Sequence, residues 1–178
     1  MLRLRWAHRI HMGTTAMRLI MIAFSLACLA AGPAFAKTYG LPDKKPAVMV
    51  TLPNSWKPTE VERGVEATSP DGETYIAIET ATAKGMEKLI DEDIKFLSEQ
   101  GVVIDKASQQ SQDTNVAGMP VSFLHWTGKD KDGPTSVTLG IFGVSDNLVM
   151  LMTAWSSPAG DKANGGDLDT ILGSIKKR

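Results

Sequence analysis

The sequence predicts an α+β domain in which two helices pack on an antiparallel sheet. Three observations lead to this prediction: short strand-like runs separated by turn residues, an amphipathic helical pattern in mid-chain, and a second helical pattern at the end. Because hairpin turns join neighbouring strand-like runs, we expect the strands to be antiparallel and both helices to cover the sheet.

Three strands are expected in the first part of the domain. Residues 47–52 form a nearly continuous apolar run that ends in a Pro-Asn-Ser turn, which is typical of a buried strand. Residues 64–68 and 74–80 flank Ser69-Pro70-Asp71-Gly72, where proline suits a type I turn and glycine closes it, so these runs are predicted to form a hairpin. Trp56 directly follows the first strand, and we expect it to fold back onto the core.

The first helix, from Met86 to Gln100, is the clearest element. Its apolar residues follow the i, i+3, i+4 spacing of one buried stripe: Met86, Leu89, Ile90, Ile94 and Leu97. The acidic run Asp91–Asp93 is interpreted as part of the solvated face rather than as a metal site, because neighbouring helical side chains diverge by about 100°. Gly101 follows, where a left-handed C-terminal cap is favoured.

Three further strands are predicted after this helix, at residues 121–127, 135–142 and 148–155, and turn-forming segments join them. Before them, residues 102–104 begin an extended segment. Residues 108–115 are polar throughout, which fits either an exposed edge strand or a loop.

A final helix is predicted from about Gly165 to Lys177. Its apolar stripe consists of Leu168, Ile171, Leu172 and Ile175. Aspartates 167 and 169 fall in its first turn and the basic residues 176–178 in its last, and both placements favour the helix dipole.

Residues 1–36 have the three parts of a cleavable secretory signal peptide. They combine a basic start, an almost wholly apolar run at residues 19–31, and the small-x-small pattern Ala34-Phe35-Ala36 after Pro33. The apolar run is too short to span a bilayer core of about 30 Å as a stable anchor. A short anchor that stays attached is the alternative, and the initiator is Met1, Met12 or Met17.

Cleavage near Ala36 predicts a periplasmic or secreted protein with no stable membrane anchor. The predicted organisation is a signal peptide at residues 1–36, a flexible lead-in at residues 37–46 and a single α+β domain at residues 47–178. The polar, proline-bearing composition of the second segment is the reason for expecting a flexible lead-in.

Removing the signal peptide also changes the composition. Cys28 is the only cysteine of the 178 residues and lies in the apolar run, so the mature domain has no disulfide, thiol catalyst or Cys-ligated metal centre. Four of the 19 basic residues and none of the 20 acidic residues are removed, which leaves a formal charge of −5. This balance, without any basic stripe, makes nucleic acid a poor partner.

Four segments carry a resemblance to a known fold. They are the strand that runs into Leu52-Pro53-Asn54-Ser55-Trp56, the Ser69–Gly72 turn, the helix at residues 86–100, and the ending Ile171-Leu172-Gly173-Ser174-Ile175-Lys176. Their arrangement resembles the PsbP-like α/β/α sandwich of photosystem accessory proteins, Ran-binding import factors and small bacterial envelope proteins such as the DcrB-like group. The resemblance implies a binding or assembly role without chemistry, and it assigns no functional residue.

The residues that could carry chemistry are few. His125 is the only histidine after residue 36 and shares a strand face with Val121 and Phe123. A lone base needs a nucleophile or an orienting carboxylate nearby, so a hydrogen-bonded histidine on a sheet face is the favoured interpretation. Residues 128–133 are interpreted as a hairpin turn rather than a calcium loop, because glycine stands at the first ligand position.

Methionine and tryptophan give the remaining candidates. The methionines after the signal peptide could bind Cu(I), but core packing is favoured for Met49, Met86, Met119, Met150 and Met152. Tryptophan is enriched at interaction hot spots, although core packing is favoured here too. The candidate interaction or pocket residues are therefore Trp56, Trp126, Trp155 and His125.

Three functions stay open. The leading one is a non-enzymatic envelope protein that acts as a protein-interaction or assembly accessory module, with an envelope protein as partner and no cofactor. The second is a periplasmic carrier of a small ligand or metal, with its pocket near the tryptophans or methionines. The third and least favoured is an enzyme centred on His125.

Overall fold

The computed structural model describes residues 35–178, so the predicted signal peptide lies outside the described residues except for its last two positions. Within this part of the chain, no helix is long and apolar enough to cross a membrane. The strands form one sheet of eight and one of three, and all pairings are antiparallel.

The larger sheet has the strand order β3-β4-β5-β10-β9-β8-β6, and β7 also pairs with β8. The predicted hairpin around residues 69–72 and the three later predicted strands are confirmed. The strands of this sheet are β3 (Thr59–Val61), β4 (Gly64–Thr68), β5 (Thr74–Thr82), β6 (Val103–Ile104), β7 (Gln110–Val116), β8 (Met119–Lys129), β9 (Pro134–Ser145) and β10 (Leu148–Ser156).

The smaller sheet corrects the prediction of a flexible lead-in at residues 37–46. It consists of β1 (Ala36–Leu41), β2 (Val48–Pro53) and β11 (Lys176–Lys177). Strand β1 pairs with β2 along its whole length and buries Tyr39 and Leu41 in the core. Only Tyr39 and Leu41, two positions apart, are buried in this strand, and the polar residues around them hide this short alternation.

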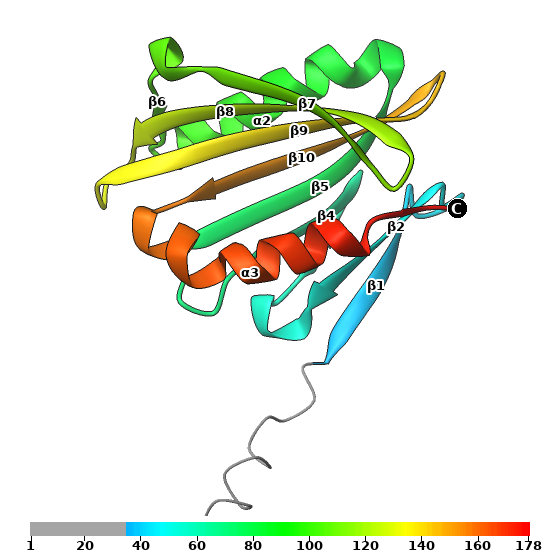
Figure 1. The fold of residues 1–178 in the computed structure, drawn as a ribbon, viewed down its shortest axis with the longest axis horizontal. Coiled ribbons are helices and arrows are strands. Elements are labelled where there is room, and N and C mark those ends of the chain that lie inside the picture. Colours follow the sequence, from blue (N-terminus) through cyan, green and yellow to red (C-terminus); the bar gives the residue numbers. More distant parts are fainter. Residues whose placement is uncertain (1–34) are drawn as a thin grey trace, which may run out of the picture. The chain divides into compact units, whose positions relative to one another are not determined.

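The two helices, α2 (Met86–Glu99) and α3 (Pro158–Ser174), cover opposite faces of the large sheet (Figure 1). Strand β10 shows the alternation: Met150 and Met152 pack in the cluster that contains Ile171 of α3, whereas Leu151 packs in the cluster that contains Leu89 of α2. The small sheet shares the core on the α3 side. Two helices packed on an antiparallel sheet confirm the predicted α+β class.

Helix α3 differs from its prediction at both ends. It begins at Pro158, where the Ser157 side chain accepts a hydrogen bond from the Gly160 N–H. It ends at Ser174, so the lysines expected in its last turn instead form β11 beside β2. The first turns of α3 contain glycine and asparagine and have no apolar stripe. Helical periodicity in the sequence therefore did not predict them.

Strand β7 settles the open question about residues 108–115. It is an exposed edge strand whose pairing with β8 starts at Gln110 and runs without a register shift to Val116. Ala117 and Gly118 connect the two strands with φ angles of 52° and 79°, and this pair of positive values defines the tight turn that suits a two-residue hairpin.

Candidate functional site

An apolar groove of about 490 Å³ lies where α2 overhangs the edge of the large sheet. We call it the α2–β6 groove. Helix α2 contributes Ile94 and Ser98, and Trp126 of β8 contributes its indole. The remaining lining comes from the segment after the helix: Val102, Val103, Ile104, Lys106 and Gln109.

The chain path after α2 creates this groove. Gly101 has a φ of 87°, the left-handed cap predicted from sequence, and it turns the chain back toward β8. Val102 is then buried, whereas the next residue, Val103, has 57% of its surface exposed. A side chain on Gly128 would place its Cβ 2.7 Å from the Val103 carbonyl oxygen, so glycine permits the close approach of β6 to β8.

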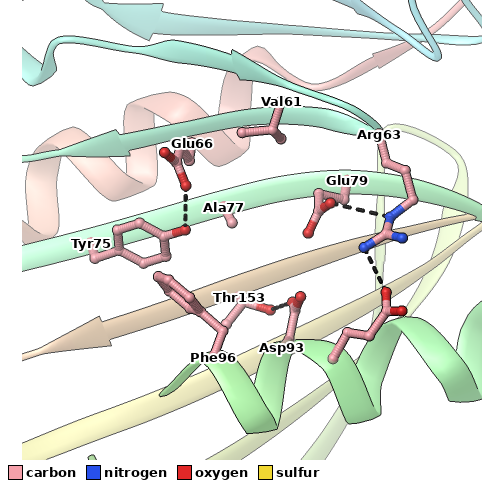
Figure 2. A pocket seen from close by; sticks show the side chains of 10 residues that line it. Val61, Arg63, Glu66, Tyr75, Ala77, Glu79, Asp93, Phe96 and Thr153 are labelled. Carbon is pink, nitrogen blue, oxygen red and sulfur yellow. Dashed lines mark hydrogen bonds and ion pairs between the residues drawn. The ribbon is translucent and has the colours of Figure 1, made fainter. Parts of the chain in front are cut away.

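A second, polar cavity of about 200 Å³ lies between α2 and strands β4, β5 and β10 (Figure 2). Arg63 extends into it, with Nε 3.3 Å from Glu79 Oε1 and Nη2 2.8 Å from Glu92 Oε2. On the other side of the cavity, the Tyr75 hydroxyl donates a hydrogen bond of 2.8 Å to Glu66 Oε2. The polar side chains of the cavity are therefore paired with one another, and Arg63 forms ion pairs with two of the acidic residues.

Two carboxyl groups of this cavity are held away from water. Burial, reinforced by the nearby charge of Asp93, raises the pKa of Glu79 to about 7, although Arg63 opposes the shift. Burial also raises the pKa of Asp93, against the hydrogen bond that Asp93 accepts from Thr153. The pair can therefore retain a proton close to neutral pH, which is the property of a proton-exchanging group or of a pH-sensitive structural contact.

The burial of Asp93 corrects its interpretation as part of a solvated face. Only 8% of its surface is exposed, and it lies four residues from both Leu89 and Leu97, which are buried. Its place in this i, i+4, i+8 series is the signal in the sequence that could have identified it as a buried acid. Within residues 35–178, no three His, Cys, Asp or Glu side chains are placed together to hold a metal ion.

Two of the predicted interaction residues share the α2 side of the sheet. Trp126 and Trp155 both lie opposite Val137 of β9, from β8 and β10 respectively. Trp126 lines the α2–β6 groove, whereas Trp155 stacks on Tyr75 with ring centroids 4.9 Å apart. The structure therefore places the two tryptophans in one row across the sheet, but only Trp126 lines the α2–β6 groove.

The other two predicted residues lie apart from the groove. Trp56 is fully buried on the α3 side, as its predicted fold-back requires, and its Nε1 donates a hydrogen bond of 2.9 Å to Asp167 Oδ2. His125 precedes Trp126 in β8, so its side chain points to the opposite face, where Nδ1 lies 3.0 Å from Thr138 Oγ1. The sequence did not identify Ile94, Val103 or Ile104 as binding residues. Apolar residues in or beside a helix predict core packing, and Ile94 was expected in the buried stripe of the helix.

At the level of sequence, the chain matches no protein-family model and no curated protein. Among solved structures it is similar to the cyanobacterial PsbP (CyanoP) of Synechocystis sp. PCC 6803, with 11% identity, a TM-score of 0.55, and coverage of 85% of this chain and 97% of that chain. A protein from Bacteroides thetaiotaomicron shows 12% identity, a TM-score of 0.51, and coverage of 75% of this chain and 46% of that chain. The chain therefore has a fold similar to that of PsbP, as its sequence predicts, and at these identities the likeness concerns the fold alone.

Proposed function

We propose that this chain is an exported, non-enzymatic protein of the cell envelope that binds another protein through the α2–β6 groove. The observation that carries the proposal is the groove itself, which is lined by the largely buried Trp126, 8% exposed, and by Val103, which has 57% of its surface exposed. Removing apolar surface of this kind from water is worth about 25 cal/mol per Å². An aliphatic or aromatic side chain of a partner protein would gain this energy by entering the groove.

Four further features support the proposal. The pattern of residues 1–36 is that of an export signal, and the following 142 residues carry a formal charge of −5, which disfavours nucleic acid. The PsbP-like resemblance implies a binding or assembly role without chemistry. In the polar cavity, the side chains that could perform acid–base chemistry are paired with Arg63, Thr153 and Tyr75.

Affinity isolation from envelope and membrane extracts tests the proposal when it compares three forms of the mature chain. Val103→Asp places a charge at the groove rim, and Ala163→Asp places the same charge on an exposed position of α3. We expect the wild type and Ala163→Asp to recover the same partner, and Val103→Asp to recover it about tenfold less well or not at all. Equal recovery by all three forms, or repeated recovery of nothing by the wild type, would contradict the proposal.

A further inference from the structure

Strand β7 leaves one side of its backbone without a strand partner among the described residues. It pairs with β8 through seven consecutive residue pairs, from Gln110↔His125 to Val116↔Met119, and no other strand lies beyond it. Six of its seven residues are exposed. The backbone N–H and C=O groups on its outer side are therefore open to solvent or to an added strand.

The tight turn at Ala117–Gly118 identifies these outward groups. In a two-residue hairpin, the residues that flank the turn form a hydrogen-bonded pair, and such pairs then recur at every second position. Val116 begins this series, so it continues through Thr114, Gln112 and Gln110 on the side of β8. Three residues remain with N–H and C=O directed outward: Ser111, Asp113 and Asn115.

Apart from the single charge of Asp113, the features that normally block an exposed edge are missing from β7. Natural edge strands carry lysine or proline, contain bulges, or are very short. Strand β7 has neither residue type, no register shift and seven residues. At the opposite edge of the sheet, β3 has only three residues, and its Glu60 is engaged by Lys37 in an ion pair of 2.7 Å.

The outer side of β7 is continuous with the α2–β6 groove, because Gln109, which lines the groove, directly precedes Gln110. The N-terminal end of β7 lies next to the groove, so the C-terminal end of a strand added antiparallel to β7 would point toward the groove. Asp113 is the only charged residue of β7, and Ser122 Oγ holds it by a hydrogen bond of 2.6 Å. Ser122 and Trp126 are four residues apart in β8, so Asp113 and the groove lie on the same face of the sheet.

We propose that β7 binds an extended segment of a partner protein by strand addition, with a basic residue opposite Asp113 and a large apolar residue four positions later in the groove. Residues at this spacing share one face of a strand, so both contacts can form together. Charge complementarity with Asp113 and the continuity of the edge with the groove favour this occupant. The inference rests on the proposed protein-binding function and names the surface and the chemistry of its partner.

A labelled nine-residue peptide, Thr-Thr-Thr-Lys-Thr-Thr-Thr-Leu-Thr, tests the inference by fluorescence anisotropy with the mature chain. Its control has the same side chains but carries N-methyl groups on the lysine and on the second residue after it, which removes two N–H donors that would face β7. We expect saturable binding of the first peptide and at least roughly tenfold weaker binding of the second. Equal affinity of the two peptides, or no saturable binding by the first, would overturn the inference.

Substitutions in β7 test the same hydrogen bonds by their effect on the affinity of the chain for the peptide. Ser111→Pro removes an outward N–H and leaves the ladder to β8 intact, and Ser111→Ala changes only the side chain. We expect Ser111→Ala to bind the peptide as the wild type does and Ser111→Pro to lose about tenfold in affinity. Asn115→Pro repeats the test at a second outward position if Ser111→Pro alters the thermal unfolding midpoint.

The two proposals fail in distinguishable ways. A partner whose recovery depends on Val103 but is unchanged in Ser111→Pro leaves the groove-binding function standing and overturns strand addition. Sedimentation velocity tests the other occupant of the edge, a second copy of this chain. Dimers that form in the wild type and are lost in Ser111→Pro would overturn the proposal of a separate partner protein.

Discussion

The Thr153 hydroxyl of β10 donates a hydrogen bond to Asp93 Oδ2 of α2, and both side chains are buried. This contact joins the helix to the centre of the large sheet and supplies a partner for a carboxyl group that would otherwise be costly to bury. The side chains of the polar cavity therefore serve to join α2 to the sheet, whereas the α2–β6 groove is lined mostly by apolar residues.

Removal of this donor should destabilise the fold. Thr153→Val keeps the side-chain shape but deprives Asp93 of its hydrogen bond, so we expect a loss of about 1–3 kcal/mol in the free energy of unfolding. Urea denaturation at pH 7 measures the change. Thr170→Val, at an exposed position of α3, is the control, and an equal effect of both substitutions would argue against a special role of Thr153.

The stability of the domain should fall as the pH rises through the titration of Glu79. The folded state raises the pKa of this group from 4.5 to about 7. The folded state therefore binds more protons than the unfolded state between these values, so the stability contribution is full below about pH 4.5 and is lost through pH 7.

Urea denaturation of the wild type and Glu79→Gln from pH 5 to pH 8 measures this contribution. The wild type should lose stability relative to Glu79→Gln as the pH rises, because the amide cannot ionise. The same substitution at the exposed Glu62 should leave the profile of the wild type unchanged. Parallel profiles of the wild type and Glu79→Gln would contradict the raised pKa.

The sequence predicted those parts of the fold in which local chemistry and packing agree. The turn at residues 69–72, the helix at residues 86–100 and the strands of the second half all have local signals that tertiary packing reinforces. Strand β1 was missed because its pairing with β2 is a tertiary contact and because it leads directly into the polar, proline-bearing residues 42–46. The start of α3 was missed because glycines interrupt its periodicity, although the Ser157-Pro158 pair is a recognisable helix start.

The candidate site was less predictable than the fold. Trp126 was identified as a candidate because tryptophan is common at hot spots. Its companions Ile94 and Val103 come from different elements, and only the reversal of the chain at Gly101 brings them beside it. The spacing of residues along the sequence does not predict this groove, because it forms where the end of a helix lies over the last strands of a sheet.

Trp56 should stabilise the fold without contributing to partner binding. Trp56→Phe removes its hydrogen bond to Asp167 and leaves part of a fully buried site unfilled, so we expect a loss of about 1–3 kcal/mol in unfolding free energy. Chemical denaturation measures this loss. Recovery of the partner at a temperature where the variant remains folded should equal that of the wild type, and a selective loss of recovery would assign Trp56 to the binding surface.

Export should remove residues 1–36. Mass spectrometry of the protein isolated from the cell envelope should give an N-terminus at Lys37, because Ala34-Phe35-Ala36 fits the requirement of signal peptidase for small residues. This cleavage preserves the β1–β2 pairing from Lys37↔Leu52 onward. Replacement of both alanines by leucine should block processing, and recovery of an uncut wild-type chain would show that the segment stays attached.

Site-specific photo-crosslinking in living cells tests protein binding by the α2–β6 groove most directly. The photoreactive residue benzoylphenylalanine is placed at Val103 in one strain and at Ala163 of α3 in another, since both positions are exposed. We predict one defined protein adduct from position 103 and none from position 163. No adduct from position 103, or the same adducts from both positions, would contradict a partner-binding role of the groove.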